Sequence, residues 1–350
     1  MNSIIKQDVE SIISKCNFWE RFKDKTILIS GANGFLPAYL VETLVYLNVV
    51  FPQHNTKVIG MVRNLDKAKK RFPHLLTNNC FELVEQDVCT YLNTIQKIDF
   101  IIHAASQASP KYYNVDPVGT LNANILGTIN LLNLAKEKNC ESFLYFSSGE
   151  VYGQVEEHRL PIDELTFGYL NPTDVRSCYG ESKRMGENLC VCYHHQYGVK
   201  AKIARPFHTY GPGMLLDDGR VFADFVSNVV NKKDIVLNSD GSAQRNFCYL
   251  ADATVGFLTV LLNGKDGEAY NVANANEEHS ILELANIVVN VKPEFNLKVV
   301  VNNKQQQSAN YVKSPISKGA PNINKVNQIG WNPTTTVQEG FLRTINSFLI

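Results

Sequence analysis

Two pairs of polar residues in the middle of the chain have the types and spacing that hydride transfer requires. Tyr179 and Lys183 are four residues apart, so a helix would place the phenol and the ammonium on one face. Ser147 and Ser148 follow a short apolar run upstream. Lys183 would hold the phenol partly ionised, and Ser148 would bridge to a substrate oxygen. The pattern predicts a site that moves a proton while a nicotinamide cofactor carries a hydride.

A second motif near the start of the chain supports this interpretation, since a lone Tyr and Lys pair is more often one packed ring and one solvated amine. Residues 26–30 form an apolar run typical of a strand, and a glycine turn and a helical pattern follow it. Gly31 would allow the tight turn, and Gly34 would let the backbone approach a pyrophosphate at a helix N-terminus. The order of strand, turn and helix predicts a dinucleotide site.

The apolar runs predict an α/β fold with a doubly wound parallel sheet of the Rossmann type. Helices are expected over about residues 117–138 and from about Tyr179 onward. We expect a helical extension over residues 1–25, an NAD(P)-binding domain with the catalytic helix over residues 26–205, and a smaller substrate-binding portion over residues 206–350. Some segments of that last portion should return to the first domain. The further strand-like runs are residues 57–62, 81–84, 100–103 and 143–146.

Composition excludes several other classes of protein. The chain has 350 residues, and its 34 basic and 34 acidic side chains cancel, so no net charge attracts nucleic acid or an anionic membrane. Eight cysteines lack metal-type spacing and are expected to be reduced. No run is long enough to span a bilayer. We therefore expect a cytoplasmic enzyme that acts on a small molecule and holds no metal.

Several independent motifs occur in an order that is known from one family. They are Gly31-Ala32-Asn33-Gly34-Phe35-Leu36, Asp87-Val88, His103-Ala104-Ala105, Asn124 with Gly127-Thr128, Ser147-Ser148-Gly149-Glu150-Val151-Tyr152-Gly153, Tyr179 with Lys183, residues 205–212 and Gly330-Trp331-Asn332-Pro333. Over residues 25–345 the chain resembles the extended short-chain dehydrogenases/reductases, specifically the NAD-dependent epimerases and dehydratases of nucleotide sugars. The resemblance implies a nucleotide-diphosphate sugar as substrate, a homodimer built on the 117–138 and Tyr179 helices, and a setting in polysaccharide biosynthesis.

The same resemblance implies which residues hold NAD or NADP. An NAD enzyme would place an acidic residue at the end of the second strand, where this chain has Arg63. Arg63 could pair with the 2′-phosphate of NADP, which gives a modest preference for that cofactor, or it could simply face solvent. The implied cofactor contacts are Gly31, Asn33, Gly34, Phe35, Leu36, Arg63, Asp87, Val88, Ala104, Ala105, Asn124, Tyr179 and Lys183.

Within the family, four segments are most similar to UDP-glucuronate decarboxylases. These are residues 105–110, 176–179, 218–221 and 240–245. The implied substrate contacts are Ser106, Ser148, His208, Arg220 and Arg245. Arg220 and Arg245 would clamp the diphosphate, a task that suits a planar guanidinium, although each could instead form a surface salt bridge.

Departures from the decarboxylase pattern bear on the reaction. An arginine expected in an Arg-Lys-Pro-Asp-Ile stretch is absent from the corresponding run, residues 319–323, unless Lys318 substitutes for it. Gly149 stands where decarboxylases carry a serine and 4,6-dehydratases an aspartate. Glu150 is retained, and it could abstract a proton beside a C4 ketone or merely hydrogen-bond the sugar.

The catalytic set is therefore Ser148, Tyr179, Lys183 and Glu150, acting at C4 of a hexose. Tyr179 would exchange the proton on the C4 oxygen, Ser148 would orient that oxygen, and Lys183 would lower the phenol pKa and bind the nicotinamide ribose. The leading hypothesis is reduction of an NDP-4-keto-6-deoxyhexose, and the alternative is UDP-glucuronate decarboxylation. Further alternatives are a 4-epimerase, a 4,6-dehydratase or a non-catalytic cofactor-binding protein.

Overall fold

A parallel seven-stranded sheet forms the centre of the computed structural model, which describes residues 1–94, 96–302 and 319–349. The strand order is β10-β6-β5-β4-β1-β2-β3. The order reverses between β1 and β4, and ligands of doubly wound sheets bind outside the carboxyl ends of the strands at such a point. This confirms the predicted fold class. The strands are β1 (Thr26–Ser30), β2 (Lys57–Val62), β3 (Phe81–Glu85), β4 (Phe100–His103), β5 (Ser142–Phe146), β6 (Ala201–Pro206) and β10 (Ala269–Val272).

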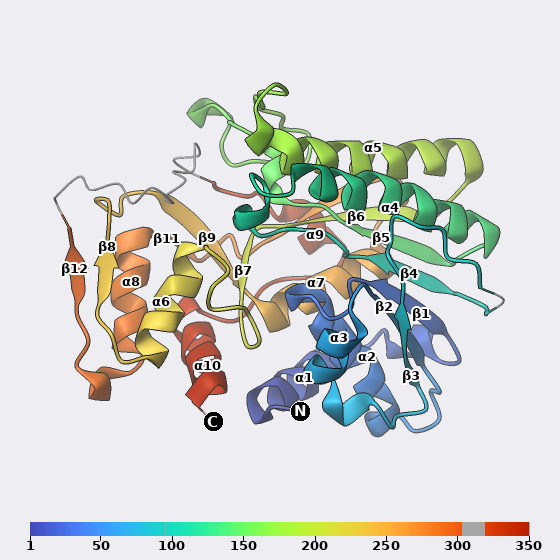
Figure 1. The fold of residues 1–350 in the computed structure, drawn as a ribbon, viewed down its shortest axis with the longest axis horizontal. Coiled ribbons are helices and arrows are strands. Elements are labelled where there is room, and N and C mark those ends of the chain that lie inside the picture. The colour runs from blue at the N-terminus through green and yellow to red at the C-terminus, as the bar shows by residue number, and fades with distance from the viewer. Residues whose placement is uncertain (95, 303–318, 350) are drawn as a thin grey trace.

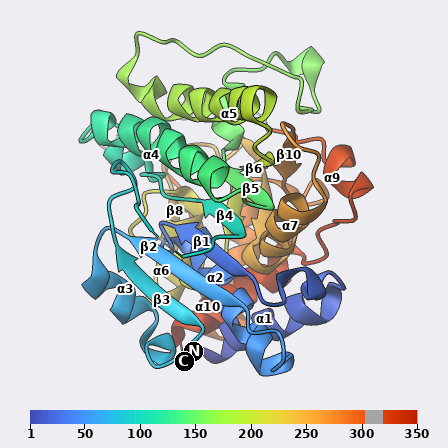
Figure 2. The same cartoon turned by 90° about the vertical axis from the view of Figure 1, so that its right-hand side faces the viewer.

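Helices cover both faces of this sheet, which explains why its central strands are apolar on both sides. In β1, Ile27 and Ile29 pack into one core and Leu28 into the other. Figures 1 and 2 show α4 and α5 on one face and α2 and α7 on the opposite face. The helices are α2 (Phe35–Val50), α3 (Leu65–Arg71), α4 (Pro117–Glu137), α5 (Cys178–Tyr197) and α7 (Leu250–Asn263). The ends predicted for β3, β5, α4 and α5 differ from the observed ones by one residue each.

Shorter elements follow β6 and form a second region, on the left of Figure 1. A three-stranded sheet has the order β11-β9-β7, and β12 pairs with β8. The chain then returns to the main sheet, because β10 pairs in parallel with β6. The elements are β7 (His208–Tyr210), α6 (Val221–Val230), β8 (Ile235–Leu237), β9 (Gln244–Tyr249), β11 (Glu278–Ser280), α8 (Ile281–Asn290), β12 (Val299–Val301), α9 (Asn324–Gln328) and α10 (Val337–Leu349).

The N-terminal residues form an amphipathic helix, α1 (Ser3–Lys15), that lies on the body of the protein. Val9, Ile12 and Ile13 on this helix are buried. No helix in residues 1–94, 96–302 and 319–349 is both long enough and apolar enough to cross a lipid bilayer.

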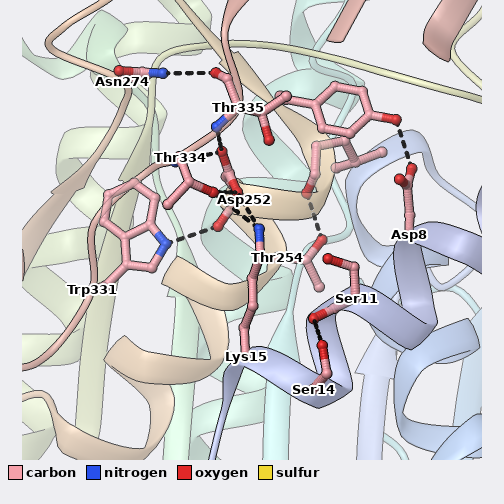
Figure 3. A network of polar contacts seen from close by, with 12 residues as sticks. Asp8, Ser11, Ser14, Lys15, Asp252, Thr254, Asn274, Trp331, Thr334 and Thr335 are labelled. Carbon is pink, nitrogen blue, oxygen red and sulfur yellow. Dashed lines mark hydrogen bonds and ion pairs between the residues drawn. The ribbon is translucent and has the colours of Figure 1, made fainter. Parts of the chain in front are cut away.

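Asp8 attaches α1 to three distant elements. The hydroxyls of Tyr39 in α2 and Tyr249 at the end of β9 donate to its carboxylate at 2.9 and 2.6 Å. Arg343 in α10 donates from Nε to the other oxygen at 2.9 Å. Figure 3 shows Asp8 reaching from α1 toward this network. Because the carboxylate is buried, these donors replace the water that would otherwise solvate it.

A second network in Figure 3 explains the Gly330-Trp331-Asn332-Pro333 motif. The Trp331 indole donates to the carbonyl of Asp252 at 2.8 Å. The carboxylate of Asp252 accepts from the backbone N–H groups of Thr334 and Thr335 at 2.8 and 2.6 Å. Lys15 of α1 lies 3.7 Å from the same carboxylate. The motif therefore fastens the chain after α9 to α7.

Replacement of Asp8 tests the first network. We expect Asp8→Ala to lower the free energy of unfolding by about 2–4 kcal/mol, because it leaves a guanidinium and two buried hydroxyls without their acceptor. Urea denaturation followed by circular dichroism measures this. Glu10→Ala is the matched control, since Glu10 is exposed on the same helix and should change stability by about 0.5 kcal/mol or less. Equal losses in the two variants would contradict the anchoring role.

Candidate active site

Tyr179 and Lys183 occupy the first turns of α5, beside the carboxyl end of β5. Both side chains are buried. The Lys183 ammonium donates to the carbonyl of Phe146 at 2.6 Å. Ser148, two residues beyond Phe146, caps a short 3-10 helix, η4 (Gly149–Tyr152), and accepts a hydrogen bond from the N–H of Glu150 at 3.2 Å. A further hydrogen bond links Ser148 to the Tyr179 phenol. The structure therefore brings the four predicted catalytic residues together.

Burial has the largest effect on the pKa values of Tyr179 and Lys183. It raises the pKa of Tyr179, although the hydrogen bond from Ser148 and the charge of Arg220 oppose this rise. Burial also lowers the pKa of Lys183 to about 7, against the favourable charge of Glu187. The sequence suggested a partly ionised phenol, but the protein alone favours a protonated Tyr179. This phenol is suited to donating a proton to a developing oxyanion.

Glu187 holds the ends of β5 and β6 against α5 through hydrogen bonds. The sequence analysis did not identify it. It is buried one helical turn after Lys183. It accepts hydrogen bonds from the Ser147 hydroxyl and from Nε and Nη2 of Arg205, the latter two at 2.8 and 2.6 Å. Ser147 is thus a structural partner, which leaves Ser148 as the serine of the site. The signal was available in the i, i+4 spacing of Lys183 and Glu187.

The glycine turn after β1 fits a dinucleotide. Gly31 has φ +65°, and a Cβ atom there would lie 2.7 Å from the Cα of Ala105, so no larger residue fits without a shift. The Ser30 hydroxyl accepts from the N–H groups of Ala104 and Ala105 at 3.2 Å each. Gly34 caps α2 without a side-chain hydrogen bond, which leaves the helix N-terminus available to an anion. Asn33, Phe35 and Leu36, all half-buried, complete this turn.

Two polar atoms beside the site are buried and have no partner in the described residues, which also fits a bound ligand. They are Oδ1 of Asn124 and the hydroxyl of Ser106. The Asn124 amide donates to the Ser182 hydroxyl at 2.9 Å and so joins α4 to α5. Unpartnered buried polar atoms are uncommon in proteins unless a ligand or water satisfies them. These atoms are therefore available to a cofactor or a sugar.

The other predicted cofactor contacts lie around the ends of β2 and β3. Val88 is buried against Gly127, where an added Cβ would come 2.8 Å from the valine. Asp87 is exposed and accepts from the N–H of Cys89 at 2.8 Å. Arg63 is exposed immediately after β2. The preference for NADP that Arg63 suggests stays a prediction.

The predicted substrate residues His208, Arg220 and Arg245 gather in the second region. Desolvation and the charges of both arginines lower the pKa of His208 to about 3, so its ring is neutral. Arg220 pairs with Asp218 at 3.1 Å and donates to the carbonyl of Ala108 at 3.0 Å. Arg245 is buried in β9. A neutral His208 cannot repel these cations, so the cluster remains positive and suits a diphosphate.

Tyr113 and Arg176 complete the surroundings of Tyr179, and the sequence analysis assigned neither a role. The ring of Tyr113 stacks on that of Tyr179 with centroids 5.0 Å apart and planes inclined by 19°. The guanidinium carbon of Arg176 lies 4.6 Å from the Tyr113 centroid. Arg176 also forms an ion pair with Glu150 at 3.3 Å. No spacing rule predicts these contacts, because Tyr113 belongs to a loop far from α5 in the sequence.

Two of the noted departures have structural surroundings that can be described. A Cβ atom on Gly149 would lie 3.2 Å from the Phe207 ring, so a larger residue there would need a small shift of that ring. Ala320 accepts from the N–H of Ile162 at 2.7 Å through its carbonyl. Lys318, the suggested substitute for the missing arginine, lies outside the described residues.

A doubly wound sheet with a glycine turn at its switch point and a Ser, Tyr and Lys set beside the adjoining strand and helix is typical of a Rossmann-type enzyme that uses a dinucleotide. A family model described as the NAD dependent epimerase/dehydratase family matches residues 27–273. The chain therefore belongs to this family, as the sequence analysis predicted.

Individual relatives agree with this assignment. The chain is 35% identical to UDP-glucuronic acid decarboxylase 1 of Arabidopsis thaliana over 324 residues, which cover 92% of this chain and 69% of that protein. Among solved structures, UDP-glucose 4-epimerase of Thermotoga maritima with UDP-glucose has a TM-score of 0.78 at 20% identity, covering 93% of this chain and 98% of that one. UDP-glucuronic acid 4-epimerase of Bacillus cereus with NAD has a TM-score of 0.74 at 23% identity, covering 92% and 96%.

These comparisons bear on the predicted reaction. They support an NAD(P)-dependent enzyme that modifies a nucleotide sugar. The relatives at above 30% identity favour the alternative, UDP-glucuronate decarboxylation, over the leading hypothesis of ketosugar reduction. The relatives named above give no support to reduction of a 4-keto-6-deoxyhexose in particular.

Lys183 should make stability depend on pH. Its folded pKa of about 7 lies below its ordinary value of 10.5. Between these values the unfolded chain binds a proton that the folded protein lacks, so the free energy of unfolding should rise with pH in this window. Lys183→Met should remove that contribution, which urea denaturation at pH 7 and pH 10 measures by difference. Lys200→Met, at an exposed site, is the control, and identical pH dependence in wild type and Lys183→Met would contradict the prediction.

Proposed function

We propose that this protein is an NAD(P)-dependent UDP-glucuronate decarboxylase that acts through C4 of the sugar. The observation that carries the proposal is Glu150, a carboxylate held next to Ser148 in η4 and close enough to Tyr179 to raise the pKa of the phenol. Simple reduction of a ketone needs a proton donor for its oxygen, which Tyr179 supplies, and has no use for a second acid. Decarboxylation does need one, because a proton must be added at carbon after carbon dioxide leaves.

The chemistry follows from a ketone at C4. The nicotinamide cofactor, when bound, supplies the oxidation of C4 and its later reduction. With C4 oxidised, the C6 carboxylate is β to a carbonyl group. The C5–C6 bond can then break, carbon dioxide leaves, and the electron pair remains as an enolate whose charge lies largely on the C4 oxygen.

The residues of the site stabilise that charge and then neutralise it. As C4 is oxidised, Tyr179 in its phenolate form would take the proton of the C4 hydroxyl, which leaves the phenol protonated. Ser148 and this protonated Tyr179 would then face the C4 oxygen, where hydrogen-bond donors act most strongly on developing negative charge. Glu150 would take a proton from solvent and deliver it to C5, and the re-formed C4 hydroxyl would regain its proton from Tyr179. Lys183 would hold the cofactor ribose and keep Tyr179 in place. No oxidant or reductant is consumed overall, since the hydride taken from C4 returns to it.

Reduction was the leading hypothesis because of Gly149, Arg63 and the missing arginine, and these features carry less weight beside Glu150. Gly149 lies against the Phe207 ring, which would have to shift slightly to admit a side chain. Arg63 is exposed, and the NADP preference that it suggests stays a prediction. The missing arginine near residue 319 remains, and Arg176 offers a replacement for it that is argued below.

Product analysis tests the function. Purified protein should release carbon dioxide and UDP-xylose from UDP-glucuronate without added reductant, and mass spectrometry of the denatured protein should find a retained NAD or NADP. Tyr179→Phe should lower kcat by about 100-fold or more, because the proton donor to the C4 oxygen is lost. Tyr197→Phe, at an exposed position on the same helix, should leave kcat unchanged. Protein that instead consumes NADPH with a 4-keto-6-deoxy sugar would sink the proposal in favour of reduction.

We also propose a homodimer through α4 and α5. Apolar side chains on both helices are exposed in the single chain, among them Leu126 and Met185. Their burial against a second copy would be favourable by roughly 25 cal/mol per Å² of apolar surface. The eight unpaired cysteines suit a reducing compartment such as the cytoplasm.

Charge placed on this surface should break the dimer. We expect the double variant Leu126→Glu, Met185→Glu to sediment as a monomer, because two carboxylates cannot be desolvated without partners. Analytical ultracentrifugation at micromolar concentration gives the mass. Val49→Glu, exposed on α2, is the control for the effect of added charge alone. A wild-type protein that is itself monomeric would refute the dimer.

A further inference from the structure

Binding of the C6 carboxylate of a uronate needs a cation with free donors, and the described residues offer few near Tyr179. Arg176 and Arg220 both place positive charge near its phenol. Arg220 is engaged by Asp218 and by the carbonyl of Ala108. The guanidinium of Arg176 has one hydrogen-bonding partner in the described part of the chain, Glu150, which it contacts through Nη2. Of these two arginines, Arg176 therefore has more N–H groups that remain available to a ligand.

The position of Arg176 is fixed from two directions. It belongs to a 3-10 turn, η6 (Val175–Ser177), that leads directly into α5, and its N–H donates to the Asp174 side chain at 2.9 Å. Its guanidinium lies over Tyr113, whose ring stacks on that of Tyr179. Arginine is well suited to such stacking, because its planar group keeps its edges free for hydrogen bonds. The two aromatic rings thus hold the cation at a set distance from the catalytic phenol.

The ion pair between Arg176 and Glu150 is weak enough for another carboxylate to replace Glu150. The contact is through one nitrogen at 3.3 Å, and the two side chains are 30% and 38% exposed. Ion pairs with this exposure add little to stability, because water competes for both charges. A carboxylate that meets the guanidinium with both oxygens makes a stronger and more directional contact.

We propose that Arg176 binds the C6 carboxylate of the substrate and releases Glu150 when it does so. The inference rests on the proposed function and supplies the cation that residues 319–323 lack. A uronate would take over the guanidinium, and the freed Glu150 carboxylate could then take a proton from solvent and deliver it to C5. A neutral sugar such as xylose has no carboxylate and would leave the pair closed. Arg176 thereby determines specificity for uronates.

Binding of two nucleotide sugars that differ in the carboxylate tests this directly. Affinities for UDP-glucuronate and UDP-xylose are measured by isothermal titration calorimetry on Tyr179→Phe protein, in which turnover of the uronate is expected to be slowed about 100-fold or more. Adding Arg176→Gln should weaken UDP-glucuronate binding about 10- to 100-fold, as expected for loss of a charged hydrogen-bonding partner, and leave UDP-xylose binding unchanged. Arg176→Lys should lie between. Arg159→Gln is the control, because Arg159 is exposed on the same connecting segment and donates to the carbonyl of Phe167.

The outcomes separate this inference from the function on which it rests. Equal weakening of both ligands would show a structural role for Arg176 and overturn the inference, as would unchanged binding of UDP-glucuronate. Either result can occur while Tyr179-containing protein still converts UDP-glucuronate, in which case the proposed function stands. Selective loss of uronate binding in a protein that releases no carbon dioxide would support Arg176 as the carboxylate site and refute decarboxylation.

Discussion

The arrangement of the whole site depends on how the fold accommodates one buried carboxylate, Glu187. An ionised group in the interior is costly unless it is paired and hydrogen-bonded. Arg205 at the end of β6 and Ser147 at the end of β5 both donate to it. This requirement fixes the ends of two neighbouring strands against α5. Lys183 sits one turn earlier on that helix, so the same constraint places it at the carbonyl of Phe146.

The sheet sets the separation between the cofactor turn and the catalytic residues. The glycine turn follows β1 and Ser148 follows β5, with β4 between them in the sheet. Neighbouring strands are about 4.8 Å apart, so the two sites are about 10 Å apart across the sheet. Parallel strands end at one edge, and the close contact of Gly31 with Ala105 keeps this edge compact. The pairing of the strands, more than the conformation of the loops, thus sets the distance between the glycine turn and Ser148.

The fold and the proximity of Ser148, Tyr179 and Lys183 could be predicted because they depend on local signals. Short apolar runs and a helical spacing of four identify β1, β4, β5 and α5 without any knowledge of tertiary structure. Tyr113 could not be found in this way, since its stacking on Tyr179 joins a loop to a helix that is distant in sequence. The surroundings of Gly149 were hidden for the same reason, because the ring beside it comes from Phe207 after β6.

The protonation of Tyr179 was also beyond the sequence. A lysine four residues away suggests ionisation, whereas complete burial of the phenol acts in the opposite direction and is larger. Burial depends on how α5 packs on the sheet and on the loop that carries Tyr113. Spacing identifies which groups meet, but the local dielectric environment decides which of them carries the proton.

The anchoring of α1 has a consequence for how the chain reaches its folded state during synthesis. Asp8 and its partner Arg343 are 335 residues apart in sequence, and Asn2 also donates to the carbonyl of Ser347. A ribosome releases the N-terminal helix long before α10 exists. The buried carboxylate of Asp8 therefore lacks its guanidinium until residue 343 has been made. The first helix can pack on α2 well before then, but its connection to α10 can close only at that later stage.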